Sequence, residues 1–158
     1  MNFLKFLMLL TLSLWLGGIL FFSAVEAPLV LSRVHDRTVG GEIISRSLAE
    51  LHWVGMICGL VFLLASLVRN YLAANTKLLT VPHVLMIFML ASTAISQYWI
   101  LPAIAELRAA QADPAAAARF QHLHSWSVGL EAAVLFLGCL VLYSEGRNPD
   151  AGQQVLTA

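Results

Sequence analysis

The residues best suited to chemistry lie in segment 119–131, where two histidines and a carboxylate enter a strongly apolar stretch of the chain. At about 100° per residue, His124, Ser127 and Glu131 share one stripe of a helix, whereas His122 points to the opposite side. An ionisable side chain more than two turns inside a spanning helix is costly unless it faces protein or water. Glu131 therefore marks either a functional site or a polar contact that only ties helices together.

Polar side chains of three other apolar segments are expected to meet this stripe. Four consecutive spans bring the end of the first, the start of the second, the end of the third and the start of the fourth to the same half of a bundle. The side chains grouped in this way are Glu26, His52, Gln97, His124 and Glu131. Polar groups in lipid need partners, and these can supply one another with donors and acceptors. We therefore predict a binding or relay site formed by His52, Gln97, His124, Ser127 and Glu131.

Three kinds of chemistry fit these side chains. His52, Met56 and His124 could ligate a transition metal ion, and the two histidines could instead be axial ligands of a haem. One ion cannot easily bind both His124 and Glu131, because seven residues separate them by about 10 Å along a helix. A proton or ion pathway needs only titratable and hydrogen-bonding groups at staggered depths, which His124, Gln97 and Glu131 supply. The sequence names no cofactor, and a purely structural polar clamp remains an equal alternative.

The composition of the chain places it in a membrane. Of its 158 residues, 59% are hydrophobic and 11% are charged, and the mean hydropathy is +0.81, far from the balance of a soluble domain. Nine basic residues balance nine acidic ones, so no nucleic-acid partner is indicated. Cys58 and Cys139 lie inside apolar segments and are expected to be buried packing residues rather than a disulfide. No nucleophile, base and orienting group occur together, so we expect no enzyme.

Four apolar segments are long enough to span a bilayer core of about 30 Å. They cover residues 6–31, 51–69, 81–105 and 120–143. We therefore predict an all-α fold, an integral membrane four-helix bundle over residues 1–145, followed by a disordered tail over residues 146–158. Because the number of spans is even, both termini are expected on the same side of the membrane.

The connections between the spans carry their own signals. Segment 32–50 is polar and is expected to end as a helix on the membrane surface, with Ile43, Ile44 and Leu48 toward the lipid. Pro102 is expected to bend or end the third span. Asp113 and Pro114 predict a turn followed by a helix start.

Small residues line one side of the first span. They are Ser13, Gly17, Ala24 and Ala27, and such a stripe lets another helix approach closely. The stripe predicts that Gly17→Leu damages folding more than Gly18→Leu, because Gly18 lies off it.

Three stretches of the chain resemble a known family of membrane proteins. They cover residues 12–22, 97–108 and 119–127, and the most specific part is Arg119-Phe120 followed by His124 and Ser127. The chain resembles the domain-of-unknown-function 4149 family, akin to transmembrane protein 205, over nearly its whole length. This resemblance implies a four-helix membrane protein without a settled biochemical activity, so it supports the fold much more than the function.

The residues and the resemblance together give one leading functional prediction. We expect an integral membrane protein of the transmembrane protein 205-like type, multi-pass in the bacterial inner membrane, with a polar intramembrane site for a proton, metal ion or small solute. The alternatives are a haem- or metal-binding electron-transfer protein and a non-catalytic membrane scaffold. Candidate partners are the lipid bilayer, a small ion or solute and a second copy of the chain.

Overall fold

A computed structural model describes residues 2–73, 80–110 and 113–147, and these residues form helices without any strand. In chain order the helices are α1 (Asn2–Phe21), the π-helical η1 (Phe22–Glu26), α2 (Ala27–Arg33), α3 (Arg37–Leu72), α4 (Val81–Ile95), the π-helical η2 (Ser96–Ile100), α5 (Leu101–Ala109) and α6 (Pro114–Arg147). They join into four continuous rods, Phe3–Arg33, Arg37–Leu72, Val81–Arg108 and Pro114–Arg147, each long and apolar enough to cross a membrane. This confirms the predicted all-α four-helix membrane bundle, while the tail beyond residue 147 lies outside the described residues.

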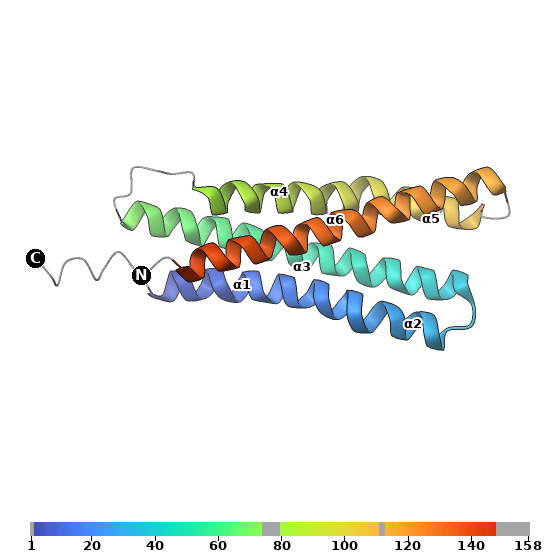
Figure 1. The fold of residues 1–158 in the computed structure, drawn as a ribbon, viewed down its shortest axis with the longest axis horizontal. Coiled ribbons are helices and arrows are strands. Elements are labelled where there is room, and N and C mark those ends of the chain that lie inside the picture. The colour runs from blue at the N-terminus through green and yellow to red at the C-terminus, as the bar shows by residue number, and fades with distance from the viewer. Residues whose placement is uncertain (1, 74–79, 111–112, 148–158) are drawn as a thin grey trace, which may run out of the picture.

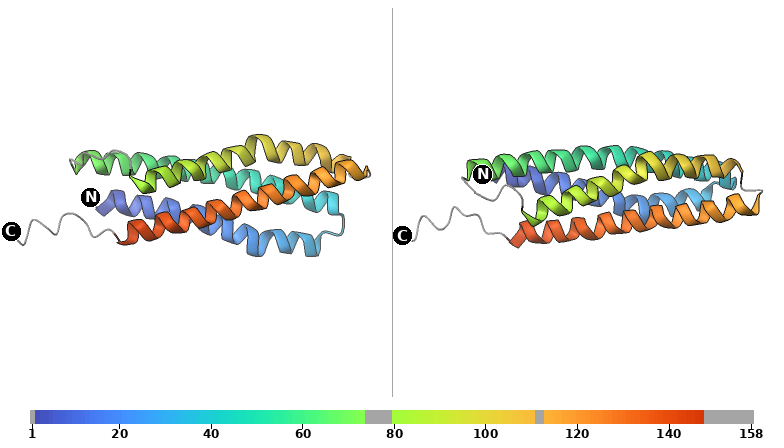
Figure 2. Two further views of the ribbon diagram at one scale, coloured as in Figure 1. Left: turned by 45° about the horizontal axis from the view of Figure 1, so that its top comes forward. Right: turned by 90° about the horizontal axis from the view of Figure 1, so that it is seen from above.

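The four rods pack side by side into one elongated bundle (Figures 1 and 2). The contacts of α1 with α3 and of α4 with α6 are the most extensive, and those of α3 with α4 and of α1 with α6 complete the bundle. α1 begins and α6 ends at the same end of the bundle, as an even number of spans requires (Figure 1). Large apolar side chains such as Phe3, Phe88 and Phe136 are exposed on its outer surface, where lipid would cover them.

Local capping explains where the rods begin. The Asp36 carboxylate accepts hydrogen bonds from the backbone N–H groups of Thr38 and Val39, at 2.8 and 3.3 Å, and so starts α3. Asp113 accepts a bond of 3.1 Å from the Ala115 N–H just ahead of α6. The predicted turn and helix start at Asp113-Pro114 are thus confirmed.

The predicted surface helix after the first span is wrong. Residues 37–50 continue directly into the second span as the 36-residue helix α3, because Asp36 caps its start and no proline interrupts it. Leu48 does not rest on the membrane surface. It packs inside the bundle with Phe22 and Leu101, so this end of the protein has its own small apolar core.

Two π-helical turns lie in the same half of the bundle. η1 comes before Pro28 and η2 before Pro102, and each proline occupies the first turn of the helix that follows. Proline has no N–H for the carbonyl one turn earlier, and widening the preceding turn lets the rod continue. Pro102 therefore does not end the third span, which runs on to Arg108. π-Turns of this kind occur often at functional sites, and η2 contains Gln97.

Trp15 lies at the centre of the main apolar core. It is 1% exposed and packs with a cluster that includes Phe62, Met86 and Met89, all fully buried. A Cβ on Gly55 would overlap the Trp15 ring, so the absence of a side chain there lets α1 and α3 approach closely. Cys58 is buried as predicted, whereas Cys139 is exposed, and both are free thiols.

The small-residue stripe of the first span faces other helices only at Ala27, which packs beside Leu48 and Leu101. Ser13, Gly17 and Ala24 are exposed, and a Cβ on Gly17 would meet nothing within 4 Å. On Gly18, however, a Cβ would lie 2.6 Å from Cδ1 of Leu51 on α3. The predicted order of damage is therefore wrong, because small residues can line a lipid-facing side as well as a packed one.

We expect Gly18→Leu to destabilise the bundle by about 1–3 kcal/mol and Gly17→Leu to be nearly neutral, because only the former overpacks a helix contact. Thermal unfolding of the two purified variants in detergent would measure the difference. Equal melting temperatures would contradict the orientation of α1.

Candidate functional site

Three side chains from three rods meet inside the bundle around His52 of α3. Its Nε2 lies 2.6 Å from Oε1 of Glu131 on α6, and its Nδ1 lies 2.9 Å from Oε1 of Gln97 in η2. The His52 side chain is 2% exposed and the Glu131 side chain 12%, so both ionisable groups are shielded from solvent. We call these three residues the His52 triad.

The orientation of the Gln97 amide determines which tautomer of His52 is present. With the Gln97 amide in this orientation its oxygen accepts, so Nδ1 carries a hydrogen and donates it. One further proton lies between Nε2 and the Glu131 carboxyl group. The two side chains then form either an imidazolium–carboxylate pair or an imidazole–carboxylic acid pair. Both arrangements are neutral overall, so the proton can move between the two atoms without creating a net charge in a low-dielectric environment.

Helix geometry explains why these three residues converge. Gly55, one turn after His52, admits Trp15, which brings α1 against the same face of α3. The π-turn of η2 inserts an extra residue before Pro102 and so changes the direction in which Gln97 points from its rod. Glu131 lies one turn after the buried Ser127, on the inner side of α6.

The structure brings together only some of the residues predicted for the site. His52, Gln97 and Glu131 form hydrogen bonds, and Ser127 is 4% exposed on the same side of α6. His124 is exposed instead, and its ring stacks on Phe120 at 6.1 Å between centroids. The partner of Glu131 is thus His52, one of the polar residues predicted to lie in the same half of the bundle. The lengths and order of the apolar segments place His52 in the right half of the bundle, but they do not determine the rotation of each helix.

The donor set does not favour the predicted metal or haem ligands. Both ring nitrogens of His52 already have hydrogen-bond partners, and His124 lies outside the triad. Met56 is only partly buried. Within residues 2–73, 80–110 and 113–147 no cluster of three or more histidine, cysteine, aspartate or glutamate side chains could hold a metal ion. A metal would have to displace Gln97 or Glu131 from His52.

A cavity of about 530 Å³ opens beside the His52 triad. It lies between the first part of α3 and the η2–α5 segment, and Gln97 forms part of its wall. The other lining residues are Thr38, Glu42, Ser45, Arg46, Ala49, Leu101, Pro102, Ala105 and Arg108. Because Gln97 both lines this cavity and bonds to His52, it connects the buried triad with the polar end of the bundle.

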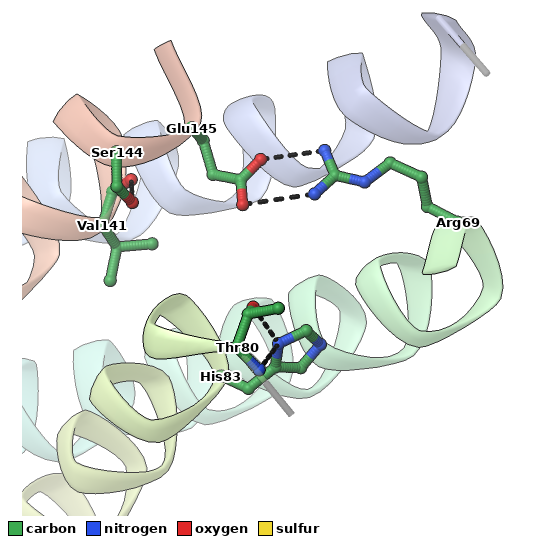
Figure 3. Close-up of polar contacts among 6 residues, drawn as sticks. All are labelled: Arg69, Thr80, His83, Val141, Ser144 and Glu145. Carbon is green, nitrogen blue, oxygen red and sulfur yellow. Dashed lines mark hydrogen bonds and ion pairs between the residues drawn. The ribbon is translucent and has the colours of Figure 1, made fainter. Parts of the chain in front are cut away.

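A second buried ion pair, not predicted from the sequence, lies at the opposite end of the bundle (Figure 3). Two guanidinium nitrogens of Arg69 on α3 donate to the two carboxylate oxygens of Glu145 on α6, at 2.8 and 3.2 Å. The Glu145 side chain is 2% exposed and that of Arg69 20%. Glu145 follows Glu131 by fourteen residues, and fourteen residues come within about 40° of a whole number of helical turns. The two side chains therefore lie on the same stripe of α6, and this pattern predicts that Glu145 is buried.

His83 lies close to this second pair and caps the start of α4 (Figure 3). Its Nδ1 accepts hydrogen bonds from the Thr80 backbone N–H at 3.3 Å and from the Thr80 hydroxyl at 2.7 Å. The N–H donor shows that Nδ1 carries no hydrogen, so the ring hydrogen is on Nε2. His83 therefore lies at the opposite end of the bundle from the His52 triad, and its contacts are those of a structural cap.

Comparison with known proteins gives one family. A family model described as a domain of unknown function (DUF4149) matches residues 10–113, more than half of the chain. The matched part includes His52 and Gln97 and ends before α6, which carries Glu131 and the Arg119–Ser127 stretch. No curated protein and no solved structure matches the chain.

Proposed function

This chain belongs to the DUF4149 family, whose description assigns no activity, and we therefore propose a function from its own polar site. The proposal is a multi-pass membrane protein that takes up a proton into the bundle through Gln97, His52 and Glu131. It is a transport function rather than an enzymatic one, in a protein of the transmembrane protein 205-like type located in a bacterial inner membrane.

One observation carries this proposal. The imidazole of the buried His52 is bonded on one side to a carboxyl group and on the other to a side chain that lines a cavity. Histidine is the side chain that most readily exchanges protons near neutral pH, and intramembrane ionisable groups mark proton relays in pumps and transporters. A clamp that only joined helices would need neither a titratable pair nor an adjoining cavity.

The chemistry of the triad supports uptake and release from the cavity side. Loss of the Nδ1 proton would leave one negative charge on the triad, with the remaining proton on Nε2 and donated to the Glu131 carboxylate. His52 Nδ1 would in turn become an acceptor, which Gln97 can satisfy by rotating its amide so that its NH₂ group donates. The proton change is thereby coupled to a movement of Gln97, the residue that lines the cavity.

Glu131→Gln tests the proposal because the amide can still donate to Nε2 but cannot accept and release a proton. In sealed lipid vesicles with an internal pH-sensitive dye and an imposed membrane potential, we expect proton uptake to fall by at least about ten-fold. The matched control is Glu50→Gln, the same change on an exposed residue of α3 two positions before His52. Equal uptake by wild type and Glu131→Gln would contradict the relay and favour the structural clamp.

A further inference from the structure

Arg108 of α5 lines the cavity beside the His52 triad and forms no ion pair within the described residues, although the Glu42 carboxylate lies near enough to interact with its charge. Three charged side chains line that cavity, and two of them pair with each other, since Arg46 lies 2.7 Å from Glu42. Within the described residues, the only hydrogen bond of Arg108 goes from Nη2 to the Ser45 hydroxyl, at 2.7 Å. The cavity wall therefore carries one net positive charge.

Two contacts with α3 position the guanidinium of Arg108. It lies close to Gly41 of α3, where a Cβ would come within 3.2 Å of its Cζ and Nε atoms. The Ser45 hydroxyl accepts from one edge of the guanidinium, and the remaining N–H groups stay available. An oriented planar fork of this kind matches the oxygens of a carboxylate or phosphate.

The uncharged polar groups of the cavity are also suited to an anion. Ser45 accepts from Arg108 and so keeps its own O–H free to donate, and the Thr38 hydroxyl lines the same wall. The carbonyl oxygen of Gln97 accepts a hydrogen bond from His52. The NH₂ group of Gln97 is therefore the end of the amide that is available to the cavity. Donors thus predominate, because Glu42 is the one carboxylate of the lining and already pairs with Arg46.

We propose that this cavity is a binding site for an oxyanion, centred on Arg108 and completed by Ser45 and Gln97. The shared chemistry is that of a phosphate group, either free in solution or on an anionic lipid at the membrane surface. An anion on the NH₂ group of Gln97 strengthens the carbonyl as an acceptor and favours a positively charged His52. This last step, by which anion and proton are taken up together, rests on the proposed proton function, whereas the anion site does not.

Binding of inorganic phosphate and of phosphatidylglycerol tests the site. The protein is placed in nanodiscs of neutral phosphatidylcholine, and its melting temperature is followed against phosphate at constant ionic strength, with chloride as reference. In a second arm part of the phosphatidylcholine is replaced by phosphatidylglycerol without phosphate. We expect Arg108→Gln to weaken the response by about ten-fold. Arg147→Gln, which removes an exposed arginine at the other end of the bundle, is the matched control and should respond as wild type.

The possible outcomes distinguish a soluble anion from a lipid headgroup, and both of these from the absence of an anion site. A response to phosphate that Arg108→Gln weakens identifies a soluble oxyanion, and one confined to phosphatidylglycerol identifies a lipid headgroup. Ser45→Ala keeps the charge of Arg108 but removes the hydroxyl that accepts its hydrogen bond, so it should weaken either response to a smaller extent. This second variant keeps the test valid if Arg108→Gln fails to fold. No response in either arm, or an undiminished one in Arg108→Gln, overturns the site. Neither of these results depends on whether Glu131 carries protons.

Discussion

Arg69→Leu is expected to lower the free energy of unfolding by about 3–5 kcal/mol, because it strands the carboxylate of Glu145 in the apolar bundle. Glu145 is 2% exposed, and both of its oxygens depend on the Arg69 guanidinium for hydrogen bonds. An ordinary hydrogen bond between membrane helices is worth only about 0.6 kcal/mol. The cost of the unpaired charge, rather than the loss of two bonds, therefore sets the size of the effect.

The double variant Arg69→Leu/Glu145→Leu separates these two contributions. Replacing a whole buried ion pair by apolar side chains is often neutral, so the double variant should recover most of the stability lost in Arg69→Leu. Unfolding in mixed micelles with increasing denaturing detergent would measure the series. Arg147→Leu serves as the control, since the polar contacts of Arg147 within the described residues are with the ring and hydroxyl of the exposed Tyr143. A double variant no more stable than Arg69→Leu would show that the pair itself stabilises the bundle.

The grouping of the His52 triad was predictable from the sequence, but its pairing was not. Apolar segment lengths fix the number of spans, and their alternating direction places His52, Gln97 and Glu131 in one half of the bundle. Which side chains touch depends on the rotation and axial position of each helix, and these are set by packing. Gly55 against Trp15 and the π-turn that carries Gln97 determine them here, and no pattern within a single segment reveals either contact.

Two other differences between the sequence-based predictions and the structure also arise from the rotation of the helices. His124 shares a helical stripe with Glu131 by counting, yet it is exposed. Near the end of α6 its partner is the Phe120 ring rather than another helix. Gly17 and Gly18 are adjacent and chemically identical, and only the position of α3 decides that Gly18 is the packed one. Periodicity gives the direction of a helix face to within about one residue, or about 100°. An error of this size can assign a lipid-facing side chain to a protein contact, or the reverse.

Glu131→Leu is expected to destabilise the bundle by about 3 kcal/mol, whereas Glu131→Gln should cost about 1 kcal/mol. Leucine leaves the Nε2 atom of the 2%-exposed His52 without a partner and removes the stabilisation of an imidazolium. Glutamine can still donate one hydrogen bond to Nε2. The Glu131→Gln variant therefore loses only the carboxylate charge. Glu50→Leu on the exposed side of α3 provides the matched control for the change of side chain.

Stability and proton uptake together then decide what Glu131 does. If the triad is a relay, Glu131→Gln folds with nearly normal stability and still loses uptake, so the two measurements diverge. If it is a clamp, uptake stays at the wild-type level in Glu131→Gln, and only Glu131→Leu is affected. A Glu131→Leu protein as stable as wild type would contradict both versions, because it would mean that the 2.6 Å contact between His52 and Glu131 does not hold α3 and α6 together.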